Sequence, residues 1–335
     1  MRITSLLFGL LAASAPLISA CATDDGQEEQ GPEDGFDDTV GDGKADTSGV
    51  SVHTVHRFAD KNLFAEGAAL DTQDHSFYVG SLTRGNVTKV GADGGESVFY
   101  AGTGEANRFT LGMQVDAARR QLWVCTTKDS LGRVWLFDLA SGQRKADVDL
   151  TTVQPKASCN DVLIDSDGSV LVSDRENRDI YRVDAQGHAK TWAHDDKLHG
   201  ALVSLNSMVF TPDHSAVLTA TYLPPTLVRV STSNPRDVQK VKLDGALFMD
   251  GFNVLNGPDD LLMHGDELIV AFGSSIKSIV SDDATWKRAT VSSQRTIGGV
   301  TALVEDGAHV YGINGQSVRF LLHLSPLEFQ IFNVR

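Results

Sequence analysis

The chain has 335 residues, a formal net charge of −15 at neutral pH and three cysteines. A protein that binds nucleic acid needs a basic face for the phosphates, so this charge argues against a nucleic-acid partner. The length is enough for one large domain or two ordinary ones.

The first 20 residues are typical of a secretory signal. Arg2 supplies a positive charge, an apolar run begins at Leu6, and small residues lead to Cys21. The run spans about 16 residues, below the roughly 20 that a membrane-spanning helix needs. Its ending, "ISAC", resembles the bacterial lipobox, in which the cysteine is acylated and becomes the first residue of the mature protein. The alternative is an ordinary signal with a chance cysteine at its end.

An acidic segment follows the signal. It holds ten acidic residues, one lysine and almost no apolar side chain, so it cannot bury enough surface to order itself. We therefore expect a lipoprotein signal peptide at 1–20, an acidic disordered linker with lipidated Cys21 at 21–50, and one folded domain at 51–335. The expected location is the bacterial cell envelope. Ala22 directly after the cysteine favours the outer membrane over the inner one.

Six repeats occupy the folded domain. Each begins with one residue at the entrance to its first strand, the threshold residue, and continues with an apolar strand, a turn and a second strand. Several repeats add a third strand such as "NVTKV" or "DIYRV". The repeats begin at Glu66, Leu111, Asn160, Asn206, Asp259 and Thr301. Four short alternating strands repeated about every 47 residues predict an all-β, six-bladed β-propeller with four antiparallel strands per blade.

The sequence leaves the closure of the propeller open. In most propellers of this kind a strand from one terminus completes the blade built by the other, which removes an exposed edge. Both "VHTVHRF" near the start of the domain and "LEFQIFNVR" at its end could be the outermost strand. One of them must have another place.

The remaining cysteines, Cys125 and Cys159, could pair in an exported protein. Cys125 ends the second strand of the second repeat and Cys159 opens the third repeat, and these two positions share one propeller face. Pairing requires Cα atoms within about 7 Å, which the sequence cannot decide. Two cysteines do not make a zinc framework.

The threshold residues of the six blades are expected to meet at one rim of the central channel. Four of them carry side-chain oxygens: Glu66, Asn160, Asn206 and Asp259. Any one of these could face water or cap a turn, but two carboxylates and two amides around a narrow axis would repel or lie unsatisfied without a cation. Such a hard oxygen set suits Ca²⁺, with Mg²⁺, Mn²⁺ or Zn²⁺ as alternatives.

The same segments resemble the SMP-30/gluconolactonase/LRE-like family of six-bladed propellers. "FAEGAALD" is similar to its Glu-Gly opening, "CNDVLIDSDG" to its Asn-Asp-Gly segment, "LNSMVFTPDHS" to its Asn-Gly segment and "PDDLLMHGDELIVA" to its Asp-Gly segment. The resemblance implies a divalent cation held by Glu66, Asn206 and Asp259. It also implies that Asn160 contacts the substrate or a metal-bound water, and that Asp259 helps to activate water.

The chain departs from the family pattern at four positions. Val162, Ser207 and Asp260 replace glycines, and Ser158 stands where sugar lactonases of the family often place a substrate-binding arginine. A sugar lactone is therefore not the expected substrate.

Three other segments carry weaker signals. His194 and His199 are interpreted as solvated loop histidines, and "SDRENRD" as a charge-rich turn. "AGTGEANRF" lacks the following helix that a phosphate-binding loop needs.

The sequence is compatible with two functions. The first is a metal-dependent hydrolase of a lactone or related ester, with water activated at a divalent cation on the propeller axis. The second is a non-catalytic propeller that binds a ligand or a protein at the cell envelope. We expect a monomer with a small-molecule substrate, attached to the membrane through its lipid anchor only.

Overall fold

The computed structural model describes residues 53–105, 108–201, 203–245 and 257–335. The expected signal peptide, the acidic linker and Cys21 lie outside the described residues. Within those residues, no helix has the length and apolar character needed to cross a membrane.

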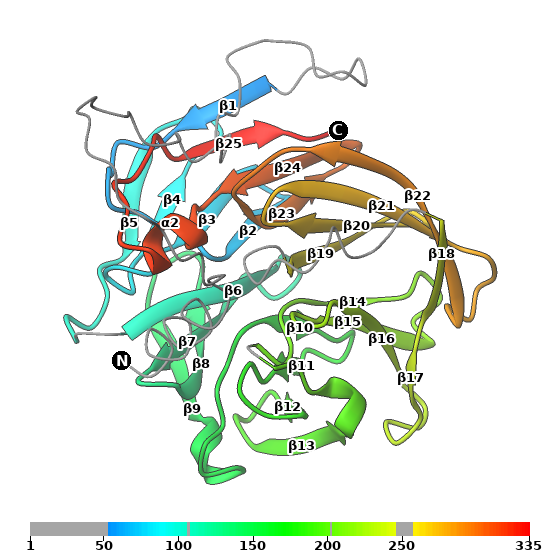
Figure 1. The fold of residues 1–335 in the computed structure, drawn as a ribbon. Helices are drawn as coiled ribbons and strands as arrows, with labels where there is room; N and C mark the ends of the chain where they lie inside the picture. The colour runs from blue at the N-terminus through cyan, green and yellow to red at the C-terminus, as the bar shows by residue number, and fades with distance from the viewer. Residues whose placement is uncertain (1–52, 106–107, 202, 246–256) are drawn as a thin grey trace, which may run out of the picture. The chain divides into compact units, whose positions relative to one another are not determined.

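The described chain folds into six sheets, which are the blades of a β-propeller (Figure 1). The predicted all-β fold with four antiparallel strands per blade is confirmed. Four blades run from the innermost to the outermost strand in chain order. They are β2 (Ala68–Asp71), β3 (Ser76–Gly80), β4 (Val87–Val90) and β5 (Glu96–Tyr100); β6 (Arg108–Asp116), β7 (Gln121–Lys128), β8 (Leu131–Asp138) and β9 (Arg144–Asp149); β10 (Val162–Ile164), β11 (Val170–Ser173), β12 (Asp179–Val183) and β13 (Ala189–His194); β14 (Met208–Phe210), β15 (Ala216–Thr221), β16 (Thr226–Ser231) and β17 (Val238–Lys240).

The next blade has a fifth strand that the repeat pattern did not predict. Its regular strands are β19 (Pro258–His264), β20 (Glu267–Phe272), β21 (Ser275–Ser281) and β22 (Arg288–Thr296). The added strand, β18 (Lys242–Gly245), pairs with β22 in parallel and so covers the outer edge of this blade. Parallel pairing leaves no hairpin signal in the sequence, because the two strands are not joined by a tight turn.

The last blade combines both ends of the domain. Its inner strands are β23 (Val300–Asp306) and β24 (His309–Asn314), its third strand is β25 (Gln330–Asn333), and its outermost strand is β1 (His53–Arg57). β1 and β25 pair antiparallel, and Thr54 Oγ1 donates to Gln330 Oε1 over 2.8 Å. Both candidate strands therefore belong to one blade, and the amino-terminal one is its edge.

The core lies between neighbouring blades. Strands β3, β11 and β15 are buried along their whole length, because both of their faces pack against other blades. This explains why they are near-continuous apolar runs and do not alternate strictly. The largest side chains in the core between the blades include Trp123, Trp135, Tyr78 and Tyr181, each at most 1% exposed.

Helical structure in the described residues is limited to one short helix and two 3₁₀ turns. Helix α2 (Ser317–Leu321) lies between β24 and β25. The 3₁₀ turns are Leu150–Thr152 and Asp196–Leu198, and the side chains of Asp149 and Asp195 cap them.

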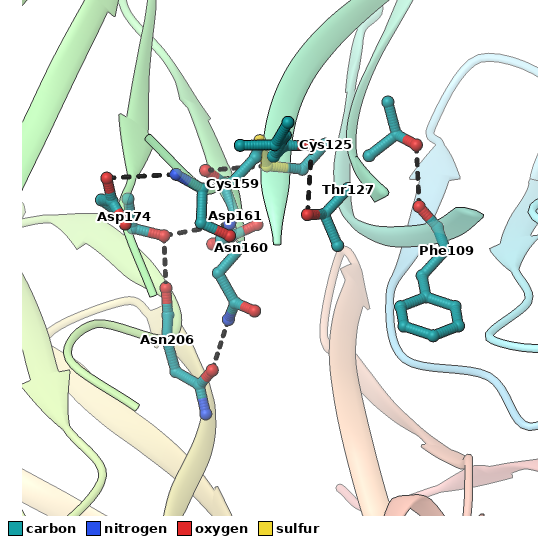
Figure 2. Close-up of a disulfide and its surroundings, with 12 residues drawn as sticks. Phe109, Cys125, Thr127, Cys159, Asn160, Asp161, Asp174 and Asn206 are labelled. Atoms are coloured by element: carbon teal, nitrogen blue, oxygen red, sulfur yellow. Dashed lines mark hydrogen bonds between the residues drawn. A yellow bond between two sulfur atoms is a disulfide. The ribbon is translucent and has the colours of Figure 1, made fainter. Parts of the chain in front are cut away.

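Cys125 and Cys159 form a disulfide, with a Cα–Cα distance of 5.6 Å. β7 continues to Lys128, so Cys125 lies within this strand and not at its end as the sequence predicted. The bond links the second strand of one blade to the segment that enters β10 of the next (Figure 2).

Candidate functional site

The threshold position is irregular in every blade. Glu66, Asn160 and Asn206 each stand two residues before their inner strand, β2, β10 or β14. Strands β6, β19 and β23 begin before their threshold residue. In each of them the pairing register shifts at that residue, for example between Pro258 and Asp260. A bulge re-aims side chains that regular alternation would send elsewhere. Asp259 owes its position to the bulge in β19.

A cavity of about 240 Å³ lies among the six inner strands. Glu66, Asn160, Asp259 and Thr301 line it, as the sequence predicted for the rim of the channel. Leu111 does not, because its side chain is fully buried in the core and its neighbour Gly112 faces the cavity instead.

Asn160, Asn206 and Asp259 form one hydrogen-bonded chain across three blades. Asn160 donates from Nδ2 to Asn206 Oδ1, and Figure 2 shows these two side chains pointing toward one another. Asn206 Nδ2 donates to Asp259 Oδ1 over 3.1 Å and to Pro258 O over 2.9 Å. The structure thus brings together three of the four residues that the sequence singled out.

Glu66, the fourth residue, is electrostatically coupled to this chain. Burial raises the pKa of Glu66 to about 7, against the opposing effect of the Arg175 charge. Burial also raises the pKa of Asp259 well above its usual range, and the negative charge of Glu66 adds to the rise. Glu66 Oε2 is buried and has no hydrogen-bond partner within the described residues. Two carboxyls in one cavity disfavour each other's ionisation. A cation bound between them would relieve this repulsion.

Two further acids, Asp161 and Asp260, line the same cavity. Asp161 Oδ2 accepts from Ser207 Oγ over 3.0 Å and from the Met208 amide over 3.2 Å. Asp260 Oδ2 accepts from the Leu303 amide over 2.6 Å. Each carboxyl therefore joins its own inner strand to that of the next blade.

Burial raises the pKa of Asp161 to about 7, with a further contribution from the charge of Asp260. Burial likewise raises the pKa of Asp260 to about 6. The sequence signal for both was an acid directly after a threshold residue, in "ND" and in "DD".

Arg175 and Tyr222 were missed by the sequence analysis. Each lies in the loop after the second strand of its blade, β11 or β15. Burial raises the pKa of Glu66 and of Asp259, and the Arg175 charge opposes this rise. The pKa of the Tyr222 phenol is raised by burial and by the negative charge of Asp259. Interpreting "SDRENRD" as a charge-rich turn was therefore incomplete, since the charge of its Arg175 acts on two carboxyls of this site.

Gly257 makes room for the Tyr222 ring. A Cβ atom at position 257 would lie 2.5 Å from Cδ2 of the ring, so only glycine fits there without a shift of the aromatic side chain.

The two loop histidines do not form a site together. His194 Nδ1 hydrogen-bonds to Asp179 Oδ1 over 2.7 Å, and His199 Nδ1 to Ser204 Oγ over 3.0 Å. In the part of the chain that the structure describes, no three His, Cys, Asp or Glu side chains converge as a metal-binding group. The threshold set is of another kind, since it combines two carboxyls with two amides.

Residues 41–276 match the family model of the SMP-30/Gluconolactonase/LRE-like region. The chain belongs to this family. No curated protein sequence matches this SMP-30/gluconolactonase/LRE-like chain significantly.

Several solved structures share its fold. The major allergen Mala s 1 of Malassezia sympodialis is 17% identical, with a TM-score of 0.68 and coverage of 84% of this chain and 95% of the other. A gluconolactonase from Xanthomonas campestris is 16% identical, with a TM-score of 0.60 and coverage of 86% and 91%. The PQQ-bound aldose sugar dehydrogenase of Streptomyces coelicolor is 11% identical, with a TM-score of 0.61 and coverage of 84% and 97%. Such low identities establish the propeller alone, and the function of this family member has to be argued from its own residues.

Proposed function

We propose that this protein is a hydrolase of a lactone or related ester that acts at a divalent cation held on the propeller axis. The observation that carries the proposal is the meeting of Glu66 and Asp259 in one cavity, where burial raises the pKa of both carboxyls. Membership of the SMP-30/gluconolactonase/LRE-like family agrees with this chemistry.

The residues present fit a divalent cation. Glu66 Oε2 is a buried acceptor with no partner among the described residues, and the oxygen-bearing side chains of Asn160 and Asp259 line the same cavity. Glu66, Asn206 and Asp259 would hold the ion, with Asn160 beside them. Two carboxylates balance two positive charges, and an all-oxygen set suits Ca²⁺ best, with Mg²⁺, Mn²⁺ or Zn²⁺ as alternatives.

Asp259 is the candidate general base. Its Oδ1 already accepts from Asn206, which fixes the orientation of the carboxyl and leaves Oδ2 for the proton of an attacking water. When bound, the cation would polarise the ester carbonyl and lower the pKa of a nearby water.

The bond changes in this proposal are those of ester hydrolysis. The water oxygen adds to the carbonyl carbon while its proton passes to Asp259 Oδ2. The carbon–oxygen bond of the ring then breaks, and the leaving oxygen takes that proton back. Asn160 would donate a hydrogen bond to a substrate oxygen, since it lines the same cavity two blades away from Asp259.

The test is a pH-indicator assay of the intact protein with a panel of γ- and δ-lactones and simple esters. We expect turnover with Ca²⁺, loss of turnover with a chelator, and recovery when the ion is restored. Asp259→Asn should lower kcat by at least about a hundredfold, since general-base catalysis contributes about 10²–10⁴-fold. Asp266→Asn changes an exposed acid and is the matched control.

The alternative of a binding propeller predicts a different result. Cation binding that depends on Glu66 and Asp259, with no turnover of any lactone or ester, would favour the non-catalytic scaffold.

A further inference from the structure

The loop between β24 and β25, which contains α2, presents apolar side chains to solvent (Figure 1). Leu322, Leu324 and Leu327 are 40%, 46% and 40% exposed. The other exposed large apolar side chains of the described residues come from four different blades: Val55, Val98, Leu131 and Val280. Single apolar side chains on a surface need no explanation, whereas several gathered together mark an interaction site. We call the three leucines of this loop the leucine patch.

Hydrogen bonds within the loop fix its shape, so the leucines are not exposed by a frayed chain. Gln316 is buried, and its Nε2 donates to Glu328 O over 3.3 Å while its Oε1 accepts from the Leu327 amide over 2.8 Å. The amides of Leu322 and Leu324 donate to carbonyls of α2, over 3.0 and 2.9 Å. The main chain at each leucine of the patch is therefore bonded within the loop.

The loop rises from the rim of the central cavity. Strand β24 ends at Asn314, which pairs with Val300 at the threshold end of β23. The ring of Phe320 packs on that of Phe64, with centroids 5.3 Å apart, and Phe64 stands two residues before Glu66. The leucine patch thus belongs to the same face of the propeller as the threshold residues.

The charge of the loop suits an anionic surface. Segment 317–327 contains Arg319 and His323 and no acid, although the chain as a whole carries a formal charge of −15. The next acid, Glu328, is paired with Arg57. An anionic lipid surface attracts basic side chains and repels the acidic remainder of the protein, so it would select this loop.

A bilayer is the partner that the rest of the chain brings to this surface. The sequence predicts a lipid on Cys21, and the linker expected at 21–50 has a span of roughly 30 Å as a random coil. The chain enters the domain through β1, the edge strand of the blade that also carries the loop. Such a tether holds the domain beside the lipid at an effective concentration on the order of millimolar. A small apolar surface is then enough for contact, and the acidic linker itself would not adhere to anionic lipid.

We propose that the leucine patch docks on the surface of a phospholipid bilayer that contains anionic lipid. Docking turns the rim of the cavity towards the membrane and gives the anchored domain one orientation. The sequence led us to expect contact with the membrane through the lipid anchor only, and the patch adds a second contact. The inference is independent of the proposed hydrolase function.

The first experiment measures this contact in the anchored protein, held by its lipid in vesicles of phosphatidylethanolamine and phosphatidylglycerol. Leu324→Trp places a fluorophore in the patch, and lipids brominated on their acyl chains quench a fluorophore that enters the bilayer. We expect the added fluorescence to be lost, because a docked apolar surface lies about 5–10 Å into the boundary of head groups and acyl chains. Val98→Trp, at an exposed position of β5 in another blade, is the matched control and should keep its fluorescence.

The second experiment measures binding without the anchor. The mature chain with Cys21→Ser carries no lipid, and its partition onto the same vesicles at millimolar lipid is followed by sedimentation. The triple variant Leu322→Ser/Leu324→Ser/Leu327→Ser should lower the partition coefficient at least about tenfold, since three leucines no longer bury apolar surface. Val98→Ser should leave it unchanged. Replacing phosphatidylglycerol by phosphatidylcholine should lower it about fivefold, which is the effect of one basic side chain near the surface.

Equal quenching at positions 324 and 98, or none at position 324, would overturn the proposal. A partition coefficient that the triple variant leaves unchanged, or no partition at all, would overturn it too. A wild-type dimer that the triple variant separates, without binding to vesicles, would assign the patch to a second copy of the chain and reject the bilayer. If Cys21 carries no lipid, the partition experiment decides alone. Equal melting temperatures of the wild type and the triple variant exclude misfolding as the cause of a loss.

Discussion

Asn206 donates a hydrogen bond to Asp259 over 3.1 Å, although 53 residues separate them in the chain. The contact crosses from one blade to the next and ties an amide to the carboxyl with a strongly raised pKa. It shows how the propeller turns residues that are remote in sequence into one polar cluster on its axis.

Glu66→Gln should have opposite effects on the cation-free protein and on cation binding. The substitution keeps the shape but removes a buried charge with a raised pKa, so the cation-free variant should be more stable than wild type at pH 8, on the order of 1 kcal/mol. Affinity for Ca²⁺ should fall at least about tenfold, because a charged ligand is lost. Thermal denaturation with and without Ca²⁺ measures both. A variant less stable than wild type without the ion would contradict the electrostatic argument, and Asp266→Asn should change neither quantity.

The stability of the cation-free protein should fall as pH rises. Glu66 and Asp161 have a pKa near 7 in the folded state and Asp260 near 6, above their ordinary values of 4.5 and 3.8. Raised folded pKa values contribute stability that is complete below the ordinary values and is lost as pH rises through about 6–7. The melting temperature without cation should therefore decrease from pH 5 to pH 8, apart from other titrations.

The gain in melting temperature on adding Ca²⁺ should show the reverse trend and grow over the same range, since the ion binds the deprotonated carboxyls. A gain that is independent of pH would mean that Glu66 and Asp259 do not hold the ion.

Removing the disulfide should destabilise the fold and disturb the cavity. Cys125 and Cys159 are fully buried and close a loop of 34 residues, and Cys159 directly precedes Asn160. A cross-link of this kind is typically worth about 2–4 kcal/mol, so the double variant Cys125→Ala/Cys159→Ala should unfold at lower denaturant concentration. If oxidised and reduced wild-type protein unfold at the same denaturant concentration, the bond contributes nothing to stability.

Deleting β1 should open the propeller. The strand pairs only along β25, and its loss would leave that strand as an exposed edge of the last blade. A chain that begins at residue 58 should aggregate or lose cooperative unfolding, whereas one that begins at residue 50 should behave as the full chain does. Cooperative, monomeric folding of the shorter chain would show that closure does not depend on β1.

Cys21→Ser should release the protein from membranes or stall its processing. We propose that this cysteine carries a lipid and that Ala22 directs the protein to the outer membrane. Fractionation of expressing cells, with mass analysis of the amino terminus, tests both parts. Soluble wild type with an unmodified terminus would rule out the anchor.

The sequence by itself determined the blades and most of the polar cluster. A blade is built from four strands that are neighbours in the chain, so its alternation and turns recur in the sequence at a regular spacing. Glu66, Asn160, Asn206 and Asp259 were found because they occupy the same place in successive repeats. The architecture of six blades with four antiparallel strands each followed from that spacing.

Tertiary structure decided what depends on contacts between segments that are remote in the sequence. β1 pairs with β25 where the ring closes, β18 adds to β22 in parallel, and Cys125 in one blade meets Cys159 at the entrance to the next. The Arg175 charge acts on carboxyls from other blades for the same reason, and burial together with the charge of Asp259, from the next blade, raises the pKa of Tyr222. No local pattern marks such residues, since the position of a loop side chain over the axis depends on how all six blades pack.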